Sequence, residues 1–127
     1  MNYIKENIIK LSSELFPQIV DIRREIHKNP ELAFIEYKTS ELICKVLADN
    51  NISYVDSIAK TGIIALIKGN NYNNNGCIAL RADMDALPIN EENNVVYKSI
   101  VPGVMHACGH DVHIASAIGA ALILNKL

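Results

Sequence analysis

Apolar residues recur every three or four positions over residues 2–28, as expected for one face of an amphipathic helix. The members of this face are Ile4, Ile8, Leu11, Leu15, Ile19, Ile22 and Ile26. Pro17 interrupts the segment, so the pattern predicts either one helix or a pair with Pro17 in the first turn of the second. A second amphipathic helix is expected from Glu36 to about Asn50. Its predicted inward-facing residues are Leu42, Ile43, Val46 and Leu47.

The period then changes to that of β-strands. Residues 52–55 alternate, whereas 62–67 and 77–82 are apolar runs typical of buried strands. The polar, turn-rich stretch 69–76 predicts that these two runs form an antiparallel hairpin with a flexible tip. Residues 86–104 show no period, so we expect an irregular connection before a last helix that begins near Asp111. This order predicts a single α/β domain, a mixed β-sheet with flanking helices.

Composition narrows the class of protein. The 127 residues are half hydrophobic and one-fifth charged, with a net charge of −2, which is typical of a globular domain and not of a disordered chain. The scattered charges offer no basic face for nucleic acid and no membrane-binding patch. No targeting segment is visible, and the odd number of cysteines, Cys44, Cys77 and Cys108, does not indicate a secreted disulfide framework. These features predict a cytoplasmic protein.

The stretch 105–113 holds one thiol, three imidazoles and one carboxylate, which are the ligand types that transition metals prefer. If it is extended, Cys108 and His110 leave the backbone on the same side and can converge on one ion. Gly109 between them permits a sharp turn. Asp111 fits the N-cap of the last helix, and it could also orient His110.

The other two histidines of this stretch have weaker assignments. His113 would lie in the first helical turn, on the side near His110. His106 either supports the metal ligands indirectly or is a solvated side chain. Three imidazoles within eight residues are hard to explain by packing alone, so the cluster favours a functional site.

A second acidic cluster lies upstream. Asp83 and Asp85 share one face if the strand persists through them, and their charges repel unless a cation or donors stabilise them. Arg81 neutralising one of them is the structural alternative. The preferred interpretation is that both aspartates converge with Cys108 and His110 near the ends of strands.

Four stretches carry a family resemblance: residues 25–32 (EIHKNPEL), 61–63 (TGI), 80–88 (LRADMDALP) and 106–113 (HACGHDVH). In this order and spacing they resemble the N-terminal third of M20-type metallopeptidases. The similarity is to the amidohydrolase branch that includes hippurate hydrolase, N-acyl-amino-acid deacylases and auxin-conjugate hydrolases. The resemblance covers the chain from about residue 20 onward. It implies part of a zinc-peptidase-like catalytic domain that hydrolyses the amide bond of N-acyl amino acids or related conjugates with a metal-activated water.

The resemblance also implies roles for single residues. Cys108 and His110 would be ligands in a site for two divalent ions, zinc or manganese, with cobalt and nickel as further candidates. Asp85 falls where the family keeps an aspartate that orients metal-bound groups. Asp83 falls where many relatives carry a metal-binding histidine, so its ligand status is open. His27 receives no direct catalytic role.

Other parts of the family's machinery would lie beyond residue 127: the general-base glutamate, the adjacent glutamate ligand, two histidine ligands and a smaller lid or dimerisation domain. By resemblance, residues 1–127 therefore form the N-terminal portion of a catalytic domain and are inactive alone. The implied partners are the remainder of the enzyme, a small N-acyl amino acid substrate and, for the whole protein, a second copy in a homodimer. Acyl-group and amino-acid specificity stay open.

Two other classes of function compete with this one. A non-catalytic metal-binding or interaction domain could retain only this half of the fold. A thiol-redox or cysteine-nucleophile protein has less support, because no second cysteine lies near Cys108 and a metal-bound thiolate is not a free nucleophile.

Overall fold

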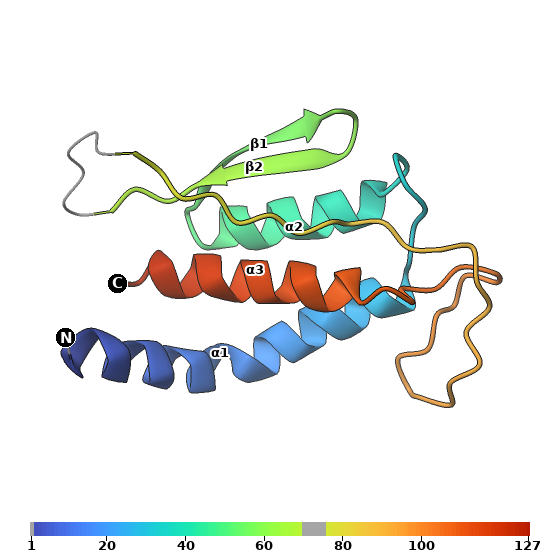
Figure 1. Cartoon of the computed structure of the whole chain (residues 1–127), viewed down its shortest axis with the longest axis horizontal. Helices are drawn as coiled ribbons and strands as arrows, with labels where there is room; N and C mark the ends of the chain where they lie inside the picture. Colours follow the sequence, from blue (N-terminus) through green and yellow to red (C-terminus); the bar gives the residue numbers. More distant parts are fainter. Residues whose placement is uncertain (1, 70–75) are drawn as a thin grey trace.

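The computed structural model describes residues 2–69 and 76–127, which form three helices and one β-hairpin (Figure 1). The elements are α1 (Asn2–Lys28), α2 (Tyr37–Asp49), β1 (Ser53–Ile58), β2 (Gly62–Leu66) and α3 (His110–Leu124). The predicted α/β class is confirmed, but the expected mixed sheet is not: in the described residues the sheet is a two-stranded antiparallel hairpin. The predicted hairpin tip falls mainly on residues 70–75, outside the described residues.

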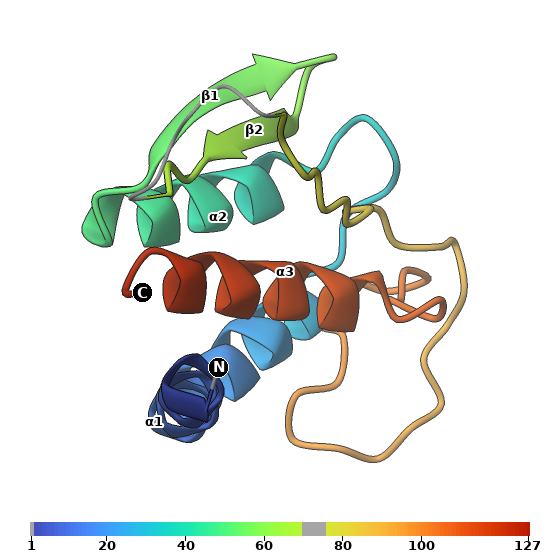
Figure 2. The same ribbon diagram turned by 60° about the vertical axis from the view of Figure 1, so that its left-hand side comes forward.

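The elements stack in layers. In both views α3 lies between α1 and α2, and the hairpin covers the side of α2 that faces away from α3 (Figures 1 and 2). The core forms where these layers meet, from Ile22, Ile26, Ile43, Val46, Leu47, Ile52, Ile114, Ile118 and Leu122. At Gly119 α3 packs against Ile19 of α1, and a Cβ added there would make an ordinary van der Waals contact, 3.5 Å from Cγ1 of Ile19. Burial of these aliphatic side chains is the main stabilising contribution.

Helix α1 is continuous, so the alternative of a helix pair divided at Pro17 is not what the structure shows. The predicted apolar face is buried only toward its C-terminal end, at Ile22 and Ile26. Ile4 and Ile8 are exposed, because no described element packs against the first turns of the helix. The helix is therefore confirmed, but the prediction that its whole apolar face is buried is wrong for the N-terminal turns.

Helix α2 agrees with its predicted range to within one residue at each end. Its free N-terminal N–H groups are capped by Glu31, which lies five residues before the N-cap Glu36. The Glu31 carboxylate accepts hydrogen bonds from the backbone N–H of Lys38 at 3.1 Å and of Thr39 at 2.9 Å. The carboxylate at this helix N-terminus also interacts favourably with the helix dipole.

The hairpin differs from the predicted one. Strands β1 and β2 pair antiparallel, with Val55 opposite Ile64, and a bulge follows Val55. Residues 77–82, predicted as the second strand, form no strand and run extended across α2 (Figure 1). Ile78 is 93% exposed in this segment, so the apolar run is not buried here. Strand pairing depends on a neighbour distant in sequence, which the local pattern does not reveal.

Residues 88–104 form the predicted irregular connection, and isolated bridges join its flanks to the rest of the fold. Leu87 bridges Met105 antiparallel, and Ala86 bridges Leu32 in parallel. In the described ranges no helix combines the length and the apolar character needed to cross a membrane.

Candidate functional site

Asp85 and His110 form the centre of the candidate site. Asp85 ends the extended segment next to the bridged residue Ala86, and His110 is the first residue of α3. Nδ1 of His110 lies 2.9 Å from the backbone oxygen of Asp85 and 3.1 Å from its Oδ1. Both oxygens accept, so Nδ1 carries the proton and donates, which leaves Nε2 with its lone pair. A carboxylate that orients a histidine in this way is a frequent arrangement behind metal ligands.

Cys108 lies two residues before His110, but the segment between them is not extended as predicted. Cys108 stands in a turn, Gly109 adopts a left-handed conformation with φ of 81°, and His110 begins the helix. The prediction of a sharp turn at Gly109 is confirmed, and the reason that glycine suits it is the absence of a Cβ. The Cys108 side chain is exposed to solvent.

Asp83 pairs with Arg81, which was the structural alternative to a role in the metal site. Its Oδ1 accepts a hydrogen bond from Nε of Arg81 at 2.9 Å and lies 2.8 Å from Nη2 of the same guanidinium. Both side chains are exposed, so this ion pair contributes little to stability. The structure therefore brings Asp85 to His110 and pairs Asp83 with Arg81.

The other two histidines of the cluster differ in environment. His113 is exposed on the first turns of α3, and its ring centroid lies 5.8 Å from that of His110, as its predicted position required. His106 is buried, and neither ring nitrogen has a hydrogen-bond partner among the described residues. Burial lowers the pKa of His106 from its ordinary value, so the ring is held neutral. The alternative of a solvated His106 is wrong.

Asp111 is not the N-cap of α3. Gly109 occupies that position, and Asp111 lies in the first turn with its side chain completely buried. Its Oδ2 lies 2.7 Å from Nδ1 of His27 at the end of α1. Nε of Arg23 lies 2.7 Å from the same oxygen, an ion pair without hydrogen-bond alignment. Asp111 therefore turns toward α1 because buried charges need a partner of opposite sign.

Glu91 completes this buried cluster from the irregular connection. Its Oε1 lies 3.1 Å from Nε2 of His27, and its Oε2 accepts the backbone N–H of Ser99 at 2.7 Å. Burial by itself would raise the pKa of Glu91, but the hydrogen bonds from Ser99 and His27 outweigh it, so the pKa lies below its ordinary value. Arg23 and Glu91 are the residues that sequence reasoning missed, because neither belongs to a metal-ligand pattern. The one signal in the sequence was the length of the irregular connection 86–104, because a long loop in a compact domain needs a side chain to anchor it.

The arrangement provides a thiol and an imidazole for a metal, oriented by one carboxylate. Within residues 2–69 and 76–127 no three His, Cys, Asp or Glu side chains come together closely enough to hold an ion. The two-donor set of Cys108 and His110 leaves at least half of a four-coordinate shell to other ligands.

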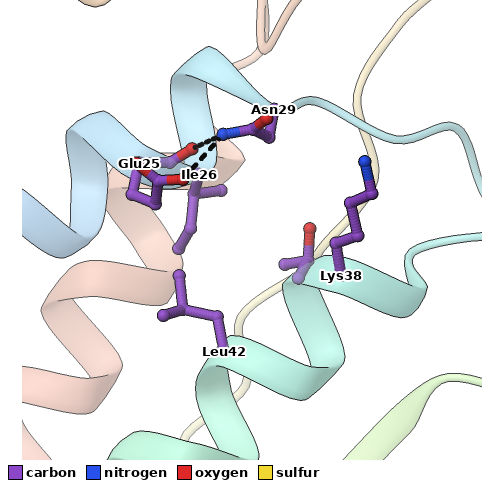
Figure 3. Close-up of a pocket in the computed structure, with 6 residues that line it drawn as sticks. Glu25, Ile26, Asn29, Lys38 and Leu42 are labelled. Carbon is purple, nitrogen blue, oxygen red and sulfur yellow. Dashed lines mark hydrogen bonds between the residues drawn. The ribbon is translucent and has the colours of Figure 1, made fainter.

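A separate hollow of about 150 Å³, open to solvent, lies between α1 and α2 (Figure 3). Ile26 and Leu42 face each other across it, and a hydrogen bond between Glu25 and Asn29 lies at its edge. None of the predicted site residues lines this hollow, and its apolar base continues the helix packing. It is not the candidate site.

Comparison with known proteins adds a family match at the end of the chain. Residues 79–127 match the model of peptidase family M20/M25/M40. This range includes Asp83, Asp85, Cys108 and His110, the residues of both predicted clusters.

Individual relatives match over most of the chain. Thermostable carboxypeptidase 2 of Saccharolobus solfataricus is 46% identical over 114 residues, which cover 89% of this chain and 28% of that protein. N-acetylcysteine deacetylase of Bacillus subtilis is 46% identical over 110 residues, or 86% of this chain and 28% of that protein. The chain thus spans less than one-third of the length of these relatives.

A solved structure agrees in fold as well as in sequence. The Bacillus subtilis YXEP protein, a dinuclear metal binding peptidase from the M20 family, superposes with a TM-score of 0.84 and 44% identity. The superposition covers 90% of this chain and 32% of that one. The arrangement of helices and hairpin described above is therefore also found within a larger protein.

Proposed function

Because the chain belongs to the M20 metallopeptidase family, we propose that it is the N-terminal part of the catalytic domain of a metal-dependent amidohydrolase. The proposed substrates are N-acyl amino acids or related conjugates, and the bond hydrolysed is the amide. A carboxypeptidase and an N-acetylcysteine deacetylase are among the relatives, and both names describe hydrolysis of an amide bond next to an amino acid. This shared chemistry supports the substrate class.

One observation carries the proposal. The backbone and side-chain oxygens of Asp85 both accept a hydrogen bond from Nδ1–H of His110, so the Nε2 lone pair of this ring is directed away from Asp85. Orienting one ring nitrogen by a carboxylate increases the basicity of the other and fixes the tautomer that binds metals.

The donor chemistry of the site fits a divalent transition metal. Cys108 and His110 would hold the ion through sulfur and nitrogen, ligands that suit zinc and also cobalt or nickel, while manganese would depend more on oxygen ligands. The dinuclear relative supports two ions in a complete site. A bound divalent ion supplies a Lewis acid for the amide carbonyl and makes a water molecule acidic enough to act as nucleophile near neutral pH.

The residues of this chain have separate tasks in that reaction. Asp85 keeps His110 in the Nδ1–H tautomer, and exposed Cys108 contributes its thiolate. His113 is exposed and lies beside His110, so it could contact the substrate or a group bound to the metal. Asp83 would reach the site only if its ion pair with Arg81 opened. The general base, the remaining ligands and the homodimer contact would come from the remainder of the enzyme.

A chimera tests whether this chain supplies a working half of the metal site. The matching segment of Bacillus subtilis N-acetylcysteine deacetylase, 46% identical over 110 residues, is replaced by the present chain. We expect the chimera to hydrolyse N-acetylcysteine, and we expect Cys108→Ala to abolish this activity while Cys44→Ala does not. A folded chimera that binds zinc but releases no acetate would contradict the proposal and favour a non-catalytic metal-binding domain.

A further inference from the structure

His27 joins three parts of the chain that are far apart in sequence. It lies at the C-terminal end of α1, is 4% exposed, and uses both ring nitrogens. Nδ1 lies 2.7 Å from Oδ2 of Asp111 in α3, and Nε2 lies 3.1 Å from Oε1 of Glu91 in the connection. Nη2 of Arg23 also lies 3.3 Å from Nδ1, so this side of the ring contacts both Arg23 and Asp111.

Basic and acidic side chains alternate in this buried cluster: Arg23 and His27 face two carboxylates, those of Asp111 and Glu91. Removing one partner of such a buried set leaves an uncompensated charge, which is much more costly than the pair is stabilising. His27 is the member that contacts both carboxylates, so it holds the arrangement together.

Asp111 transmits this contact to the site because it directly follows His110. With 3.6 residues per turn, their side chains leave α3 about 100° apart. When His27 and Arg23 hold Asp111 against α1, the rotation of the first turn of α3 is set. The His110 ring is then presented to Asp85.

The same end of α1 also holds Asp85. Beyond His27 the chain continues to Glu31, whose backbone oxygen accepts the N–H of Ala86 at 2.7 Å. Ala86 is buried and directly follows Asp85, so this bond places Asp85 beside the N-terminus of α3. Both members of the Asp85–His110 pair are therefore attached to the segment that contains His27.

We propose that His27 is a positioning residue for the metal site: through Asp111 it sets the orientation of His110, without contacting metal or substrate itself. The inference rests on the proposed function, because it concerns the metal ligand His110. In this proposal the contact of His27 Nδ1 with Asp111 orients His110, whereas the contact of Nε2 with Glu91 holds the irregular connection 88–104 in place.

The two sides can be separated by substitution. In His27→Asn the amide nitrogen takes the place of Nδ1 and can still donate to Asp111. In His27→Gln it takes the place of Nε2 and can still donate to Glu91. Glu31→Gln serves as the matched control, because it weakens the cap of α2 but keeps the backbone oxygen that holds Ala86.

Cobalt(II) titration of the full chain, followed by the visible spectrum of the ion, is the first measurement. We expect His27→Gln to lower cobalt affinity by about 10- to 100-fold and to change the spectrum, as loss of an orienting partner does. His27→Asn and Glu31→Gln should retain nearly the wild-type affinity and spectrum. Equal losses in His27→Gln, His27→Asn and Glu31→Gln would overturn the proposal, because His27 would then act only through general stability. Wild-type behaviour of His27→Gln would overturn it as well.

A metal-free measurement keeps the proposal separate from the proposed function. In nitrogen-15 NMR spectra of the apo chain, we expect a single Nδ1–H tautomer for His110 in wild type and His27→Asn, and a tautomer mixture in His27→Gln. A wild-type chain that does not bind cobalt would contradict the proposed function, while the tautomer spectra would still decide the role of His27. If a His27 variant does not fold, Arg23→Gln removes the other group at Asp111 and should broaden the His110 tautomer distribution; an unchanged spectrum would overturn the inference.

Discussion

Asp85 contacts Nδ1 of His110 with two different oxygens, one from its side chain and one from its backbone. The backbone contact at 2.9 Å is the shorter, and it survives any substitution of the side chain. The orientation of His110 therefore depends partly on the path of the main chain at residue 85. Because Glu31 holds the next residue, that path is set by the end of α1.

The double contact predicts graded effects of Asp85 variants on zinc affinity. Asp85→Ala removes the charged acceptor but not the backbone oxygen, so we expect a loss near the lower end of the 10- to 100-fold range. Asp85→Asn keeps a neutral oxygen and should lose less. Calorimetric titration measures the affinities, with Asp21→Asn on the exposed surface of α1 as control. An unchanged zinc affinity in Asp85→Ala would show that the Asp85 side chain does not contribute to the metal site.

The cysteines should differ in metal binding. We expect weak zinc or manganese binding by the chain, because two ligands leave the rest of the shell to water. Cys108→Ala should abolish it, whereas Cys44→Ala should not, since burial and the charge of Asp56 raise the pKa of the Cys44 thiol. Binding should also weaken in acid, because the ligands must lose or lack protons. Tight binding that survives Cys108→Ala, seen by calorimetry, would place the site elsewhere.

Gly109 and Gly103 offer a matched pair of backbone substitutions. Both have left-handed φ values, 81° and 76°, so alanine at either position should reduce the free energy of unfolding by about 1 kcal/mol. Gly109→Ala should in addition weaken zinc binding, because it changes the turn between Cys108 and His110. Gly103→Ala should leave the affinity unchanged. Urea unfolding and calorimetry test the pair, and equal zinc affinities would show that this turn does not position the ligands.

His106 should reduce stability, most strongly in acid. Its buried nitrogens lack partners in the described structure, so His106→Leu should raise the free energy of unfolding by about 1 kcal/mol. The folded state keeps the ring neutral, but the unfolded chain binds a proton as pH falls below 6.5, so wild type loses stability there. The variant lacks this loss, and its advantage should grow between about pH 7.5 and about pH 5.5. Urea unfolding at both pH values measures the difference; a smaller advantage in acid would contradict the assignment.

The isolated chain should hydrolyse N-acetyl amino acids slowly or not at all. By family resemblance we expect the general-base glutamate beyond residue 127, and metal-assisted hydrolysis needs a base to take the proton of the attacking water. Acetate release from N-acetyl amino acids, with zinc or manganese present, is the measurement. Robust turnover that Cys108→Ala abolishes would mean that a residue of this chain serves as the base.

Local sequence was sufficient where structure depends on near neighbours. The periods of three and four predicted α1 and α2, because a helix places residues close in sequence on one face. Gly109 predicted a sharp turn because its freedom at positive φ is a property of one residue. The spacing of Cys108 and His110, together with the family resemblance, also indicated where chemistry should be sought.

Tertiary structure decided which distant groups meet. The apolar run 77–82 pairs with no strand. A strand forms only beside a partner edge, and the sequence of the run does not show whether such a partner is present. Asp111 fits a helix cap by sequence, yet its carboxylate binds His27, 84 residues away. Only the packing of α3 on α1 buries that charge and so requires an opposite one beside it. Folding thereby gave His27, Arg23 and Glu91 a shared position that no local pattern marks.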